Sequence, residues 1–144
     1  MEKKMGLSLN EFYDLIKKGM VFLKTDFSWA QLEGAALGYE VFINASFKNA
    51  NLKNADFLLG GLINTDLSYA DMEGARLIGA KLSGSNLYRA NLNGAKYSSS
   101  TIWPDNFDPI AAGAVLDNEP PNSDPESILG FMNRGGYPKT HKDW

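Results

Sequence analysis

The chain has 144 residues, a net charge of −3 and 44% apolar residues, so it suits one domain with a core of its own. It contains no cysteine, which excludes disulfides and thiolate metal sites. Its charge gives no general attraction to nucleic acid or to anionic membranes. Residues 1–14 lack the apolar stretch of a signal peptide, and no run approaches the length of a membrane span. We therefore expect a soluble, cytoplasmic protein without membrane contact.

The first predicted element is a helix over residues 8–18. Ser8 and Glu11 have the spacing of a capping box, and Gly19 suits the position after a helix end. One face of the helix carries an apolar stripe, formed by Leu9, Phe12, Leu15 and Ile16. We expect residues 1–19 to cover the open end of the element that follows, and a partner-binding amphipathic helix is the alternative.

A five-residue period dominates residues 20–104. Every fifth residue is large and apolar over seventeen consecutive positions: Phe22, Phe27, Leu32, Leu37, Phe42, Phe47, Leu52, Phe57, Leu62, Leu67, Met72, Leu77, Leu82, Leu87, Leu92, Tyr97 and Ile102. The residue two positions before each of these is usually small. A period of five fits neither an α-helix nor a flat strand. If each five-residue unit forms one side of a polygon, the large and the small residue both point to the axis, and stacked coils satisfy each other's backbone groups.

Two places depart from the period. Glu40 stands in the column of small residues, and Gly60 and Gly61 follow each other within one unit. A carboxylate at an inward position is costly unless it reaches solvent or a partner.

Several units follow one formula, which is alanine, then aspartate or asparagine, then a large apolar residue, as in residues 50–54 (ANLKN), 70–74 (ADMEG) and 90–94 (ANLNG). This formula resembles the repeat signature of the pentapeptide-repeat family, and the resemblance extends over about 85 residues. It implies an all-β solenoid, a right-handed quadrilateral β-helix of about four coils with four units per coil. The N-terminal helix and the segment around residues 111–114 are also similar to those of cyanobacterial members.

Residues 105–144 follow the repeat as a predicted cap and irregular tail. We expect Trp103 and Phe107 to cap the last coil, because the prolines that flank them cannot continue a ladder. Residues 117–127 have the composition of a linker, and a short helix can begin at Asp124.

The outward positions predict a contact surface. With four units per coil, residues twenty apart stack on one face. Two faces then carry polar residues such as Lys48, Glu33 and Glu73, while apolar residues gather on the other two. We call this second set the apolar seam; it consists of Val21, Leu23, Tyr39, Val41, Ile43, Leu58, Leu59, Ile63 and Ile78. Such a seam on a monomer indicates contact with something. Its occupant is the chain's own tail, through Ile128, Leu129, Phe131 and Met132, or else a second copy or a protein partner.

The repeat carries no excess of either charge. Its acidic residues are Asp26, Glu33, Glu40, Asp56, Asp66, Asp71 and Glu73, and its basic residues are Lys24, Lys48, Lys53, Arg76, Lys81, Arg89 and Lys96. Some members of the family resemble duplex DNA and engage DNA gyrase, which requires an acidic surface. A neutral rod is a poor mimic of a polyanion. A DNA-mimic regulator of a type II topoisomerase is therefore the alternative to a protein-binding module, and nucleic acid is not an expected partner.

The sequence offers little for catalysis. His141 is the only histidine, so a histidine triad or a histidine metal site is excluded by count. The acidic residues form no dense pair and the glycines recur with the repeat, so they do not indicate a phosphate loop. We predict no catalytic residue, cofactor or metal, and we expect a non-enzymatic protein-binding scaffold.

Overall fold

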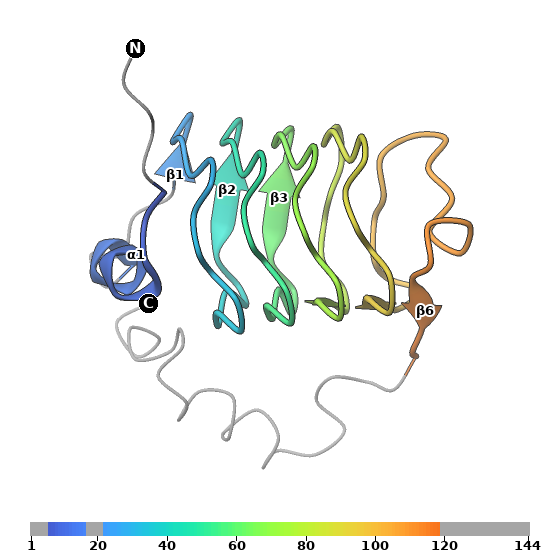
Figure 1. The fold of residues 1–144 in the computed structure, drawn as a ribbon. Coiled ribbons are helices and arrows are strands. Elements are labelled where there is room, and N and C mark those ends of the chain that lie inside the picture. Colours follow the sequence, from blue (N-terminus) through green and yellow to red (C-terminus); the bar gives the residue numbers. More distant parts are fainter. Residues whose placement is uncertain (1–5, 17–21, 119–144) are drawn as a thin grey trace.

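The computed structural model describes residues 6–16 and 22–118, which form a helix and a stack of coils (Figure 1). The elements are α1 (Leu9–Ile16), β1 (Phe22–Leu23), β2 (Val41–Ile43), β3 (Gly61–Ile63), β4 (Arg76–Leu77), β5 (Lys96–Tyr97) and β6 (Val115–Leu116). The strands form two parallel three-stranded sheets, ordered β1-β2-β3 and β4-β5-β6.

The coils stack with a register of twenty residues. Phe22 pairs with Phe42, and Phe42 pairs with Leu62. Backbone groups outside the strands follow the same register, as where the Leu52 N–H donates to the Asp71 carbonyl at 2.8 Å. One coil therefore takes four five-residue sides, and each coil satisfies the backbone groups of its neighbours.

Eight sides begin with a side chain that accepts a hydrogen bond from the backbone of the same side. The Asp56 carboxylate accepts a hydrogen bond of 3.0 Å from the N–H of Leu58, two residues later. The same contact recurs from Asp26, Ser46, Asn51, Asp66, Asp71, Asn86 and Asn91. Short side chains with an oxygen acceptor suit this role, which explains the preference for aspartate and asparagine before the large residue.

The core is the axis of the solenoid. Sixteen of the seventeen large residues, from Phe22 to Tyr97 at five-residue intervals, are buried, and they alternate with buried small residues such as Ala30 and Ala55. Phenylalanines of successive coils stack on each other, with ring centroids 5.2 Å apart for Phe22 and Phe42. Such ring pairs add to the burial of apolar area.

Helix α1 lies against the first coil. Ser8 and Glu11 form a reciprocal capping box, with distances of 3.0 and 3.2 Å between each backbone nitrogen and the other side chain. Phe12 is fully buried, and its ring centroid lies 5.0 Å from that of Phe27. Further α1 and flanking residues pack on the core: Leu7, Leu9, Tyr13 and Leu15. Residues 17–19, where the sequence predicts the helix end, lie outside the described residues.

The seventeenth large position was predicted wrongly. Ile102 is 45% exposed and pairs with Lys81, which is an outward residue. The turn before it closes one residue late, because the Thr101 N–H donates to the Ser98 carbonyl. Thr101 is therefore buried in the small column, and Trp103 packs on the core in place of Ile102.

The chain continues to pair beyond the repeat. Trp103 packs edge-on against Tyr97 at 5.5 Å and stacks on Phe107 at 5.1 Å, across the end of the core. The chain then returns to the stack, where β6 pairs with β5 through Lys96 and Val115. The predicted linker beyond residue 118 and the helix from Asp124 lie outside the described residues.

Candidate functional site

The apolar seam is exposed on the face of sheet β1-β2-β3. Leu23 is 60% exposed and pairs in register with Ile43, which pairs with Ile63. Ile43 and Ile63 are half-buried, and Val41 beside them is exposed. The backbone ladder thus presents apolar side chains on three successive rungs, with their neighbours Phe22, Phe42 and Leu62 buried in the core.

The other residues of the predicted seam differ in their exposure to solvent. Leu59, at the corner next to β3, is exposed, and Tyr39 at the same corner is half-buried. Leu58 and Ile78 are only 2% and 3% exposed, so they offer no surface to a partner in this structure. Val21 and the tail residues 128–132 lie outside the described residues. We call the accessible part the exposed seam; it consists of Leu23, Val41, Ile43, Leu59 and Ile63.

Glu40 borders the exposed seam. It occupies the column of small residues, next to Val41, and Gly60 takes its place on the following coil. Burial raises the pKa of the Glu40 carboxyl to about 7. The pKa of Tyr39 is also raised, mainly by burial; the Arg76 charge opposes this rise and the Asp56 charge adds to it.

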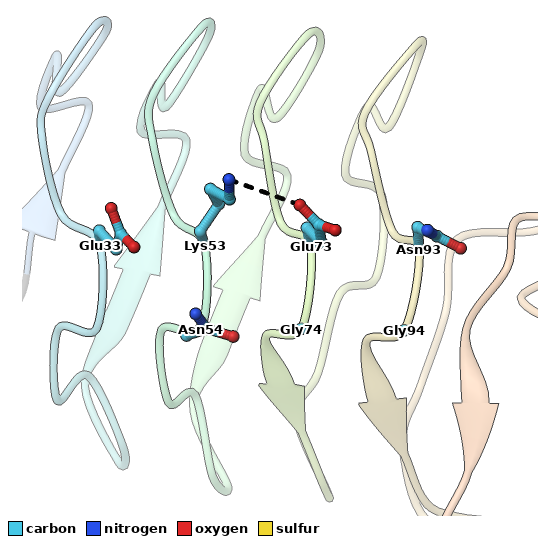
Figure 2. A pocket seen from close by; sticks show the side chains of 7 residues that line it. All are labelled: Glu33, Lys53, Asn54, Glu73, Gly74, Asn93 and Gly94. Carbon is cyan, nitrogen blue, oxygen red and sulfur yellow. Dashed lines mark ion pairs between the residues drawn. The ribbon is translucent and has the colours of Figure 1, made fainter.

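A polar groove runs along another face. It has a volume of about 530 Å³ and is lined by Glu33, Lys53, Asn54, Glu73, Gly74, Asn93 and Gly94. Figure 2 shows Glu33, Lys53, Glu73 and Asn93 in a row on successive coils, with an ion pair of 3.5 Å between Lys53 and Glu73. Both side chains are well exposed, so the pair adds little stability.

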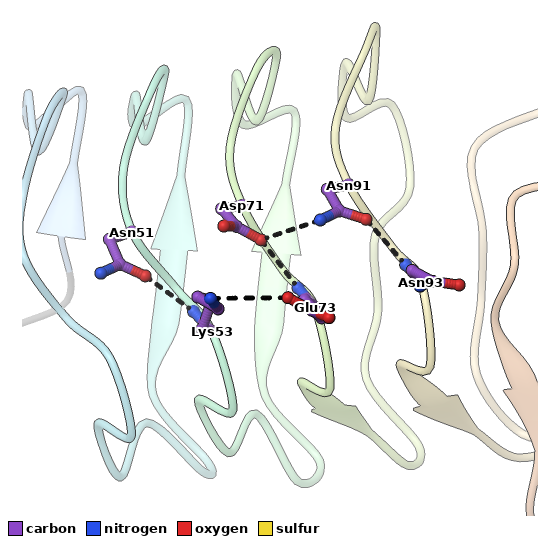
Figure 3. Close-up of polar contacts among 6 residues, drawn as sticks. All are labelled: Asn51, Lys53, Asp71, Glu73, Asn91 and Asn93. Carbon is purple, nitrogen blue, oxygen red and sulfur yellow. Dashed lines mark hydrogen bonds and ion pairs between the residues drawn. The ribbon is translucent and has the colours of Figure 1, made fainter.

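Two acidic groups of this face, Asp71 and Glu73, are already engaged. The Asp71 carboxylate accepts from the Glu73 N–H at 3.2 Å and from the Asn91 side-chain amide at 3.1 Å (Figure 3). On a neighbouring face Asp56 pairs with Arg76 at 3.1 Å. Acidic and basic groups therefore face each other across coils, and these acidic groups serve the turns and the pairs.

The prediction that two faces carry polar residues missed an aromatic cluster. Tyr88 is 59% exposed, and its ring packs edge-on against exposed Tyr69 on the preceding coil, with centroids 5.8 Å apart. The Arg89 guanidinium lies 5.6 Å from the Tyr88 ring centroid. Trp29 is exposed at the same corner as Tyr69, two coils away. The signal was in the sequence, because residue 88 stands twenty positions after Ser68 and shares its face.

The described ranges, 6–16 and 22–118, hold no group of three or more histidine, cysteine, aspartate or glutamate residues placed to bind a metal. Within the same ranges no helix has the length and apolarity needed to cross a membrane. His141 lies outside them.

The family model for pentapeptide repeats matches residues 25–57 and 62–96 with eight copies. The crystal structure of alr5209, a pentapeptide repeat protein from Nostoc Pcc 7120, is 31% identical, with a TM-score of 0.60 over 79% of this chain and 100% of that one. A pentapeptide repeat protein from the Arabidopsis thaliana thylakoid lumen is 26% identical, with a TM-score of 0.58 over 82% of this chain and 78% of that one. The comparison with curated proteins gives no match.

The parallel rungs, the buried axis and these likenesses define a right-handed β-helix solenoid. The chain belongs to the pentapeptide-repeat family.

Proposed function

We propose that the protein is a non-enzymatic, cytoplasmic protein-binding scaffold that uses the exposed seam as its contact surface. The observation that carries this proposal is the in-register ladder of Leu23, Ile43 and Ile63. An apolar surface of this kind on a soluble molecule is a liability unless something binds it.

The fold supports a binding role because it fixes this surface in advance. The exposed seam lies on parallel strands whose inward residues are buried. We propose that about four coils, with α1 covering one end, form one rigid unit. A surface that is already ordered loses little conformational entropy on binding. Aliphatic side chains in its centre can be desolvated at low cost, as in the core of a protein interface.

A non-enzymatic role agrees with how the polar side chains are used. Most aspartates and asparagines that precede a large residue hold their own side of the coil, as Asp56 and Asp71 do. The polar groove has an exposed Lys53–Glu73 pair where a catalytic site would need groups in a desolvated setting.

The occupant is a second copy of this chain or a different protein. A DNA-mimic role is less well supported, because acidic groups alternate with basic ones, as in the pairs Lys53–Glu73 and Asp56–Arg76. A mimic of a polyanion needs an uninterrupted acidic stripe. Inhibition of gyrase supercoiling by the purified protein would favour that role over the scaffold.

Photo-crosslinking tests the seam directly. A photo-reactive amino acid replaces Ile43 in one variant and Glu33, on the polar face, in a matched control. The proposal predicts a defined crosslinked protein, either this chain or a host protein, from position 43 and not from position 33. Equal or absent crosslinking at both positions would reject it.

A further inference from the structure

The four corners of the solenoid differ in the residues that occupy the left-handed backbone region. Two corners use residues that tolerate a positive φ, mainly glycine and asparagine: Lys24, Asn44, Asn64 and Gly84 at one, and Gly34, Asn54, Gly74 and Gly94 at the other. The other two corners place large side chains there: Tyr39 and Leu59 at one, followed by Gly79, and Trp29, Tyr69 and Arg89 at the other, with Asn49 between Trp29 and Tyr69.

Large side chains at these positions are strained. A left-handed backbone costs an L-residue about 1–2 kcal/mol, and asparagine and glycine reduce this cost. Trp29 and Tyr69, at φ of 66° and 62°, are also exposed, so core packing does not explain them. Strain that persists at exposed positions indicates that the side chains themselves are used.

Trp29, Tyr69, Tyr88 and Arg89 form one surface, which we call the aromatic corner. Inter-coil hydrogen bonds fix its order along the axis, as from the Tyr69 N–H to the Tyr88 carbonyl at 2.9 Å. Tyr69 and Tyr88 meet edge to face, and Arg89 lies over Tyr88. The corner is separated by two sides of the coil from the corner of Leu59, so it is distinct from the exposed seam.

The spacing of these rings matches one kind of ligand. Neighbouring coils lie ~4.8 Å apart, so Trp29 and Tyr69, two coils apart, are offset by ~9.6 Å along the axis. In a polyproline II helix, residues three apart are separated by ~9.3 Å. We propose that the aromatic corner binds an extended, proline-rich segment of a partner protein, with two prolines on Trp29 and Tyr69.

Arg89 adds a requirement for charge. It lies one coil beyond Tyr69, which is ~4.8 Å further along the axis. Asp66 is an acidic residue on the same face, but its carboxylate already accepts from the Ser68 N–H at 2.9 Å. An acidic residue of the partner segment, just past the second proline, would meet the Arg89 guanidinium, which pairs well with carboxylates.

The test is fluorescence anisotropy with the full chain and a labelled peptide. The probe has two prolines three residues apart and a glutamate after the second; one control peptide replaces both prolines by alanine, and another replaces the glutamate by lysine. We expect the probe to bind at least about tenfold more tightly than either control. Trp29→Asn and Tyr69→Asn should each weaken binding of the probe about tenfold, while Asn54→Gly, at another corner, leaves it unchanged.

Stability separates a binding role from a structural one. Trp29→Asn relieves backbone strain, so it should raise the melting temperature of the protein while it weakens binding of the probe. Equal affinity for the probe and the alanine peptide would overturn the proposal, as would unchanged binding by Tyr69→Asn or a lower melting temperature of Trp29→Asn. Tighter binding of a single-stranded oligothymidylate at this corner would also overturn it. Ile63→Asp should leave probe binding intact, so failure here is distinguishable from failure of the exposed seam.

Discussion

Ile43 and Ile63 pair in parallel register on adjacent strands, and both side chains point away from the core while Phe42 and Leu62 beside them are buried. Residues on one face of these strands therefore stabilise the fold, and residues on the other face are available to contact a partner. Substitutions in the two sets should have different consequences.

The first prediction concerns this separation. Leu62→Ala should lower the free energy of unfolding by about 2–5 kcal/mol, because it leaves a cavity in the axis. Ile63→Asp should lower it by about 1 kcal/mol or less, because the side chain faces outward. Urea denaturation followed by circular dichroism measures both. Equal losses would mean that the two columns do not differ as the structure shows.

The second prediction concerns Glu40. Its carboxyl has a pKa of about 7 in the folded protein and an ordinary value of 4.5. Between these values the unfolded chain releases the proton while the folded one keeps it, so stability falls as pH rises through this window. The loss should reach about 3 kcal/mol above pH 7.

Glu40→Gln should flatten this pH dependence, and Glu73→Gln, at an exposed ion pair, is the matched control. Urea denaturation at several pH values between 4.5 and 8 measures the free energy of unfolding of each variant. An identical slope in wild type and Glu40→Gln would show that another group causes it.

The third prediction compares two corner glycines. Gly84 and Gly94 both have φ near +70°, and a Cβ at Gly84 would overlap the Asn64 side-chain oxygen, whereas one at Gly94 meets nothing within 4 Å. Gly94→Ala should cost about 1–2 kcal/mol from backbone strain alone. Gly84→Ala should cost slightly more, because the flexible Asn64 side chain must turn aside, and Asn64→Gly should remove this excess. An excess that survives in the double variant would argue against the overlap.

The fourth prediction concerns Trp103. Its indole N–H is buried and has no hydrogen-bond partner among residues 6–16 and 22–118, while its ring packs on Tyr97 and Phe107. Trp103→Phe should change the free energy of unfolding by no more than about 1 kcal/mol, because removal of an unpaired donor offsets lost area. Trp103→Ala should cost about 3 kcal/mol. Thermal denaturation ranks the two, and a large loss with phenylalanine would mean that the N–H is paired.

The sequence predicts the axis of the fold well, because a five-residue period requires one inward geometry at every unit. Sixteen large residues follow it, and the aspartates and asparagines before them occupy the turns that explain their recurrence. Ile102 could not be placed by period alone. Both it and Trp103 are apolar, and only the turn at Ser98 decides which of them faces inward.

The surface is less predictable than the axis. Leu58 and Ile78 occupy outward positions in the repeat and yet are buried, because burial of an outward side chain depends on what packs over it and not on its place in the repeat. Tyr88 is the opposite case, since counting twenty residues from Ser68 places it on an outward face. The strain at Trp29 and Tyr69 can be recognised only from backbone angles, which the residue pattern does not give.

The most direct test of the scaffold proposal compares two aspartate substitutions in one outward column. Ile63 belongs to the exposed seam, and Ser83 occupies the same column on the next coil. The measurements are sedimentation velocity of the purified variants and quantitative capture from a host extract. The proposal predicts that Ile63→Asp abolishes the dimer or the captured protein while Ser83→Asp retains it. Full retention by a folded Ile63→Asp variant would contradict it.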